Sequence, residues 1–170
     1  MDHLDSISAL LLRELRALRR ELELYPSDDA LWATPPGIAN SGGTLAIHVL
    51  GNLRHYVGAR LGATGYVRDR ASEFTVRQVP RERILAELDR AAEDVRAALA
   101  NADPSRLAED FPEVVGGFRV ETGDFLMQVA VHLAYHVGQL DYHRRIVIGD
   151  GRTATTMAMA ELRSARQADS

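Results

Sequence analysis

Four long stretches of this sequence carry apolar residues at steps of three and four, and this spacing restricts the fold more than any other feature. Apolar side chains at these steps share one face of an α-helix, because the helix has a period of 3.6 residues. The pattern predicts helices over residues 3–25, 41–62, 80–101 and 122–148. Such helices bury their apolar faces against one another, so the sequence predicts an all-α protein, a four-helix bundle.

The connections between the predicted helices are long and rich in helix-breaking residues. Pro26 ends the first helix, and Pro35, Pro36 and Gly37 interrupt the segment that follows. Asn40 or Ser41 is expected to cap the second helix. Long connections allow the chain to cross over between helices as well as to run up and down. We expect one domain over residues 1–170, with Trp32 closing an end of the bundle.

Three segments outside the four helices have patterns of their own. Residues 63–79 are expected to form a connection that is basic around Arg68 and Arg70 and then extended. The pair Gly116-Gly117 lies between short β-prone runs and predicts a small hairpin within residues 104–121. Thr122 is expected to cap the helix that follows. Residues 153–165 predict a short fifth helix.

The composition excludes several classes of function. The chain has no cysteine, which excludes disulfides, thiolate zinc sites and a cysteine nucleophile. Its net charge is −4, and its basic residues are dispersed among acidic ones, which argues against a nucleic-acid partner. The start of the chain is acidic and resembles no secretory signal. No apolar run is long enough to cross a membrane, so a cytoplasmic protein is expected.

Two histidines of the last long helix are spaced for a shared ligand. His132 and His136 are four residues apart, so their rings lie one turn above the other on the same face. Helices with the HExxH motif place two zinc ligands in this way, but here no glutamate follows the first histidine. A metalloprotease of that type is therefore excluded, because the general base is missing.

A third ligand is expected from the second helix. His48 lies in the middle of that helix, at the edge of its apolar face, and bundles build metal sites from facing helices. Three protein ligands would leave positions open for water or substrate. Alternatively, each histidine is a core residue whose ring is hydrogen-bonded. Several buried imidazoles without partners would be costly, and a shared metal removes that cost.

Two further histidines and several neighbours are candidates for the same pocket. His55 and His143 each lie two turns from a predicted ligand, so they either line the pocket, act as general acid or base, or simply pack. We take them as the candidate catalytic residues. Asn52 and Gln139 are expected to orient ligands, while packing is expected of the nearby tyrosines Tyr135 and Tyr142.

Glycines and the last helix predict close contacts. Gly51, Gly58 and Gly62 form a ridge of small residues on the second helix, which suggests that another helix or a ligand approaches there. The last helix, residues 122–148, is apolar around most of its circumference. A helix of this kind is buried on two sides, and the second side is expected to be a subunit interface.

The order and spacing of these motifs resemble the DinB family of damage-inducible helical-bundle proteins. The resemblance rests on Trp32 and the Pro/Gly-rich link into Ser41, on LAIHVLGNL at residues 45–53, and on HLAYHVGQL at residues 132–140. It covers about residues 5–148. The segments NLRHYVG, YVRDR and EF within residues 52–74 look like one subgroup of the family.

This resemblance implies a function as well as a fold. It implies a bundle, often dimeric, with a site for a divalent ion such as nickel or zinc, and His48, His132 and His136 match its three ligands. Relatives include bacillithiol S-transferases and mycothiol-dependent maleylpyruvate isomerases. We therefore expect a metal-dependent enzyme of the thiol S-transferase type, or a related isomerase or hydrolase, acting on a small electrophile with a low-molecular-weight thiol. The alternatives are a non-catalytic metal-binding protein in stress response and a dimeric scaffold whose histidines only pack.

Overall fold

Four long helices form the body of the molecule, as the sequence predicts. The computed structural model describes residues 3–154, 159–162 and 164–168. The long helices are α1 (His3–Glu23), α3 (Gly42–Leu53), α5 (Arg81–Ala100) and α6 (Thr122–Ile148). α3 continues without a break into a π-helix, η1 (Arg54–Ala59). Shorter elements lie between and after them: α2 (Asp28–Trp32), α4 (Arg70–Thr75), η2 (Pro104–Ala108) and η3 (Met159–Glu161). The all-α prediction is confirmed for the described residues.

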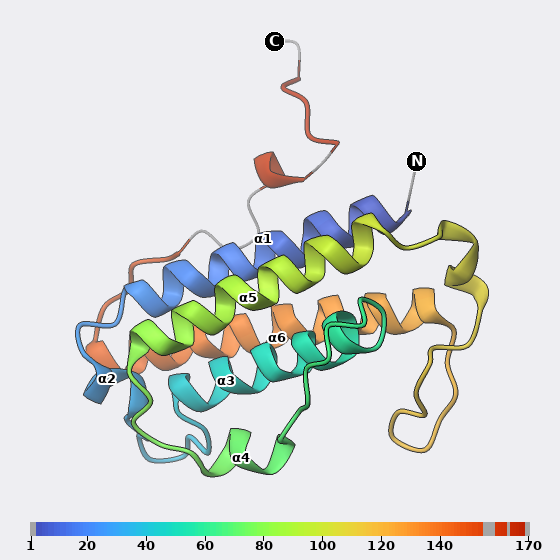
Figure 1. Ribbon diagram of the computed structural model, residues 1–170. Helices are drawn as coiled ribbons and strands as arrows, with labels where there is room; N and C mark the ends of the chain where they lie inside the picture. The colour runs from blue at the N-terminus through green and yellow to red at the C-terminus, as the bar shows by residue number, and fades with distance from the viewer. Residues whose placement is uncertain (1–2, 155–158, 163, 169–170) are drawn as a thin grey trace.

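The helices form a crossover bundle. α1 packs against α5 and α6, and α3 packs against the same two helices from the other side. α1 and α6 run in one direction and α3 and α5 in the other (Figure 1). The chain must therefore return along the bundle after η1 before α5 begins parallel to α3. Residues 60–80, which we call the crossover segment, make this return and carry α4 along the side of α3 (Figure 1).

The apolar stripes that predict the helices also form the core. All six stripe residues of α1 are buried: Leu4, Ile7, Leu11, Leu15, Leu18 and Leu22. They pack in one cluster with the inward faces of the other three long helices. Ser41 is the N-cap of α3, and its hydroxyl accepts a hydrogen bond from the backbone N–H of Thr44 at 3.1 Å. Trp32 donates to the carbonyl of Val79 at 3.0 Å, which joins α2 to the chain just before α5.

The glycine ridge confirms the expectation of close approach. A Cβ atom on Gly58 or Gly62 would lie 2.9 Å from side-chain atoms of Asp94 or Ala98, both on α5. A Cβ on Gly51 would instead lie 2.2 Å from a carboxylate oxygen of Glu73. Gly58 and Gly62 thus allow α5 to pack closely, whereas Gly51 makes room for a single side chain of α4, that of Glu73.

The predicted hairpin is present in a minimal form. Val115 and Phe118 form an isolated antiparallel bridge around Gly116-Gly117, and both glycines have positive φ values, 59° and 88°. Positive φ at both central positions is the backbone of the tight turn that the Gly-Gly pair predicts. Within the described residues the pairing extends to one more bridge, Asp110 with Glu121, and to no strand.

Three local expectations are wrong or only partly tested. The crossover segment is not extended after Arg70, because Asp69 caps a short helix there by accepting from the N–H of Ser72 at 3.1 Å. Thr122 is the first residue of α6 rather than its cap, and its hydroxyl donates to the carbonyl of Glu109. Of the fifth helix expected at 153–165, residues 155–158 and 163 lie outside the described residues, and only the turn η3 is described.

No described helix is both long and apolar enough to cross a membrane.

Candidate metal centre

The structure brings the three predicted ligands together. His48 projects from the middle of α3, and His132 and His136 project from successive turns of α6, which packs against α3. The ring centroid of His48 lies 5.3 Å from that of His132 and 5.1 Å from that of His136. One ring nitrogen from each histidine can be chosen so that all three lie within 4.8 Å of one another. His48 is buried, and the two histidines of α6 are half-buried.

A hydrogen bond on the outer side of His136 directs its inner nitrogen toward His132. His136 Nδ1 lies 2.7 Å from the side-chain oxygen of Gln139, so this nitrogen carries the proton and Nε2 has a free lone pair. His136 Nε2 lies 3.1 Å from His132 Nε2. A cation between the rings would replace that hydrogen bond, with both Nε2 atoms as ligands. The orienting role expected of Gln139 is therefore supported, whereas Asn52 makes no side-chain hydrogen bond among the described residues.

A carboxylate holds the third histidine. His48 Nδ1 lies 2.9 Å from Glu73 Oε2, and because a carboxylate only accepts, Nδ1 carries the proton and Nε2 is left free. Glu73 also forms two hydrogen bonds with Arg68, whose Nε and Nη2 donate to its two oxygens at 2.7 and 2.9 Å. Both partners come from the crossover segment. Metal-binding histidines commonly donate their second N–H to a carboxylate in this way, which fixes the ring.

Burial and mutual proximity keep the imidazoles of His132 and His136 neutral. Burial, then His136, His48 and Arg68, lower the pKa of His132 to about 4. Burial and His48 also lower the pKa of His136, against the opposing effect of the Gln139 hydrogen bond. Burial alone would raise the pKa of Glu73, but hydrogen bonds from His48 and Arg68 outweigh it and the pKa is lowered. Near neutral pH His132 and His136 therefore offer uncharged nitrogen donors, and the carboxylate of Glu73 beside His48 is ionised.

Two aromatic rings flank the histidines. Phe74, next to Glu73 on α4, lies 4.9 Å from the ring of His48. Tyr135 lies 5.2 Å from the ring of His136, but it is 62% exposed, so the packing role expected of it is wrong for the single chain. Tyr142, also expected to pack, is 67% exposed.

His55 lies outside the three-histidine group, at the start of the π-helix. Its Nε2 is 3.0 Å from a carboxylate oxygen of Glu113, in the hairpin segment, and Arg60 donates to the same oxygen. Its Nδ1 is buried and has no hydrogen-bond partner among the described residues. His55 thus forms a histidine–carboxylate pair of its own, and its predicted catalytic role stays a prediction.

His143 is part of the packed end of the bundle. It is 3% exposed, with Nδ1 2.7 Å from the hydroxyl of Tyr25 and Nε2 2.9 Å from the carbonyl of Ala33. The carbonyl can only accept, so Nε2 carries the proton and Nδ1 accepts from Tyr25. Burial lowers the pKa of His143 and so keeps the ring neutral, although the hydrogen bond to Ala33 opposes this effect. With both nitrogens used, these contacts favour packing among the roles expected for this residue.

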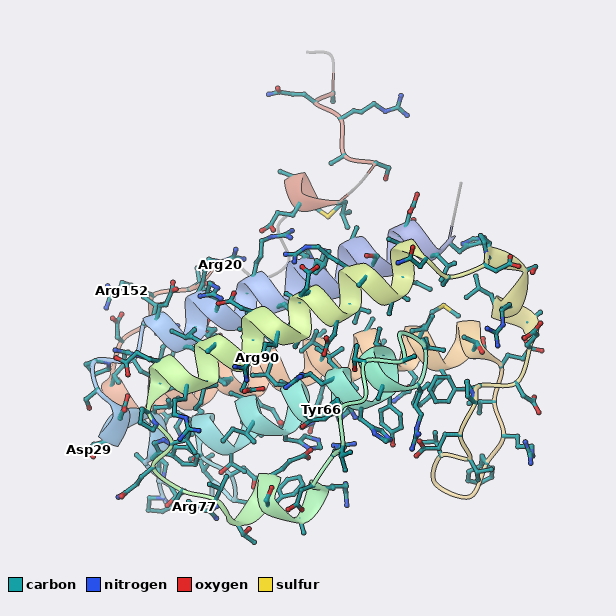
Figure 2. All side chains as sticks on the ribbon, viewed as in Figure 1. Arg20, Asp29, Tyr66, Arg77, Arg90 and Arg152 are labelled. Carbon is teal, nitrogen blue, oxygen red and sulfur yellow. The ribbon has the colours of Figure 1, made fainter. Side chains whose placement is uncertain are left out.

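Apart from Glu113, the partner of His55, the residues that sequence reasoning missed come from the crossover segment. Arg68, Glu73 and Phe74 complete the surroundings of His48, and the connection also attaches to η1 through Tyr66, whose ring lies 4.3 Å from the Arg54 guanidinium. Figure 2 labels Tyr66 on the part of this segment that leads to α4, and Arg77 just beyond α4. Two signals were available in the sequence. Gly51 is a glycine inside a helix one turn from His48, and the subgroup segments YVRDR and EF contain Arg68, Glu73 and Phe74.

The donor set suits a borderline divalent ion. Three neutral imidazoles are typical ligands for zinc, nickel and other late first-row metals, at about 2.0–2.1 Å for zinc. The three nitrogens are close enough to share one ion, and the outer nitrogens of His48 and His136 already have acceptors. The site fits such an ion.

Comparison with known proteins agrees with the helical arrangement. A family model described as the DinB superfamily matches residues 8–140, a span that includes all three histidines of the group. Among proteins with curated functions, none matches this sequence.

Proposed function

The chain belongs to the DinB superfamily, and on that premise we propose that it is a metal-dependent enzyme that joins a low-molecular-weight thiol to a small electrophile. One observation carries the proposal: His48, His132 and His136 each place one ring nitrogen within 4.8 Å of the others, between α3 and α6. Three protein ligands leave coordination positions free, which is typical of reactive rather than structural metal sites.

The chain's own residues supply binding and orientation. Glu73 and Gln139 hold His48 and His136 with their free nitrogens turned inward. Phe74 and Tyr135 provide apolar surface on two sides of the site, against which the carbon skeleton of an electrophile can rest. A bound divalent ion would stabilise the thiolate form of a thiol substrate, which is the nucleophile in such reactions. Nickel and zinc are the ions that we expect.

His55 is the candidate for proton transfer if the substrates extend toward the hairpin. Its pairing with Glu113 resembles the histidine–carboxylate arrangement that orients a general base. The reaction balances without another reagent: the thiol loses its proton, sulfur bonds to carbon, and the electrophile either opens a ring and takes up the proton or releases halide.

The test measures metal content and turnover in the same preparations. Purified protein is analysed for metals by mass spectrometry and assayed with a panel of thiols against an epoxide and a halogenated aromatic. We expect about one ion per chain and turnover that requires both metal and thiol. His48→Ala should lose both, whereas His3→Ala, a change at an exposed histidine of α1, should lose neither.

The outcomes separate the alternatives. Full activity in chelator-treated protein would contradict the proposal. Bound metal with no turnover across the panel would support a non-catalytic metal-binding protein instead. Protein without metal, whose thermal stability does not change on chelation, would support a scaffold whose histidines only pack.

A further inference from the structure

Glu73 is an unusual residue for a connection between helices. It is only 3% exposed, although it lies in a short helix on the side of the bundle. Both of its oxygens are used: Arg68 Nε donates to Oε1, and Arg68 Nη2 and His48 Nδ1 donate to Oε2. Burying a carboxylate is costly unless it is paired and hydrogen-bonded, so this arrangement needs a reason.

The neighbouring helix is shaped to receive this carboxylate. A Cβ on Gly51 would lie 2.2 Å from Glu73 Oε1 and 3.0 Å from its Cδ. Gly51 is therefore the residue of α3 that leaves room for the carboxylate beside His48. Glycine inside a helix costs about 1 kcal/mol relative to alanine, so the space that Gly51 provides for the carboxylate lowers the stability of α3. Elsewhere in the described part of the chain, buried ion pairs such as Arg144 with Glu21 do not involve the histidines of the site.

The negative charge of Glu73 explains what its hydrogen bond to His48 adds to the site. Three neutral imidazoles bring no charge to balance a divalent cation, and Glu73 is the only carboxylate among the described residues that hydrogen-bonds to one of the three. Arg68 compensates that carboxylate when no ion is bound. A cation on His48 would be stabilised by the negative charge behind the same ring, because the ring transmits the interaction through its Nδ1–H.

We propose that Glu73, seated against Gly51 and held by Arg68, is a positioning residue that sets the affinity of the three-histidine site for its divalent ion. It fixes His48 with Nε2 directed at the two histidines of α6. Since the same side chain attaches α4 to α3, ion binding and the docking of α4 are coupled, and each must strengthen the other by the same factor. This inference rests on the metal site of the proposed function but does not depend on the reaction.

The first experiment measures zinc affinity by competition with a chromophoric chelator. Glu73→Gln keeps the size of the side chain and removes its charge, and we expect zinc to bind about 10- to 100-fold more weakly, as for other residues that orient a ligand. Gly51→Ala keeps the charge and displaces the carboxylate, and we expect a loss in the same direction. The two variants perturb one contact from opposite sides.

Each variant has a matched control elsewhere in the chain. Glu21→Gln also removes the charge of a buried glutamate paired with an arginine. Gly58→Ala also introduces a methyl group into a tight contact in the helical stretch that follows His48, against Asp94. Both controls should lower the thermal stability of the protein but leave its zinc affinity unchanged.

Two further readouts report on positioning rather than on general stability. The absorption bands of bound cobalt(II) should shift in Glu73→Gln relative to wild type. In wild-type protein, zinc should slow hydrogen exchange of the α4 amides, and in Glu73→Gln this protection should disappear.

Several results would overturn the inference. One is that Glu73→Gln binds zinc as tightly as wild type. Another is that Glu21→Gln loses as much zinc affinity as Glu73→Gln, since that would indicate a general effect of stability. If Glu73→Gln does not fold, Gly51→Ala against Gly58→Ala decides the question. Wild-type protein that binds neither zinc nor nickel would overturn the inference and the proposed function together. Zinc binding without turnover would count against the proposed enzyme alone.

Discussion

At the scale of single residues, the structure separates histidines that look alike in the sequence. One ring nitrogen from each of His48, His132 and His136 lies within 4.8 Å of the others. His55 instead pairs with Glu113, and His143 is hydrogen-bonded to Tyr25 and to the carbonyl of Ala33. The pair on α6 was predictable because spacing within one helix fixes which residues share a face. The different surroundings of His55 and His143 depend on distant parts of the chain, so the sequence left several roles open for both.

Acid should destabilise the metal-free protein through His132. The pKa of this group is about 4 in the folded protein and has an ordinary value of 6.5. Between these two values the unfolded chain holds a proton that the folded chain does not, so the free energy of unfolding decreases as pH falls from about 6.5 to about 4. Urea unfolding in the presence of chelator, measured at several pH values across this range, tests the expectation.

A variant identifies the group responsible. His132→Asn should remove up to about one proton from the pH dependence of the free energy of unfolding. Some dependence should persist in His132→Asn, because the pKa values of His136 and His143 are lowered as well. Identical pH profiles for wild type and His132→Asn would contradict this assignment.

At the scale of elements, the long helices were predictable and the short ones were not. A stripe such as that of α1 repeats over many turns, so a helix is indicated even where single residues are ambiguous. α4 has only six residues and no repeat, and its formation depends on the cap at Asp69 and on the burial of Glu73. For that reason the sequence suggested extended chain where the structure has the helix that completes the site.

Two glycines of α6 should respond in opposite directions to the same substitution. Gly149 ends the helix with a φ of 65°, and Gly138 lies inside it; an added Cβ would meet no atom within 4 Å at either position. Gly149→Ala should lower the free energy of unfolding by about 1 kcal/mol, because alanine disfavours the left-handed conformation. Gly138→Ala should raise it by about 1 kcal/mol through helix propensity.

Chemical denaturation of the two variants and wild type measures both effects. Because neither methyl group meets another atom of the same chain, each acts as the control for the packing effect of the other within the chain. The same sign of change in both variants would show that the backbone conformation of Gly149 does not govern the end of α6.

At the scale of the whole molecule, one face of α6 lacks a partner in the single chain. It carries large apolar side chains at helical spacing that are each more than half exposed: Met127, Val131, Tyr135, Tyr142 and Ile146. Contiguous exposed apolar surface often marks a protein interface. We propose that the homodimer expected from the sequence forms through this stripe, with two copies of α6 in contact about a twofold axis.

Light scattering coupled to size-exclusion chromatography tests the dimer. Wild-type protein should elute with the mass of two chains, and Val131→Glu, which places a charge in the middle of the stripe, should elute as a single chain. Val67→Glu is the control, since Val67 is 87% exposed on the crossover segment and is not a residue of the stripe. A wild-type monomer, or a Val131→Glu dimer as stable as wild type, would exclude this interface.

The sequence by itself determined the helices, the buried stripes and the shared helix face of His132 and His136. These depend on periodicity, which neighbouring residues set through the geometry of one helix. Tertiary structure alone decided that α3 and α5 run parallel, and that the crossover segment between them lies along α3. That path places Glu73 against Gly51 and His48. Such a contact joins residues 25 positions apart in the chain, and no local pattern specifies it, because it exists only once the bundle has formed.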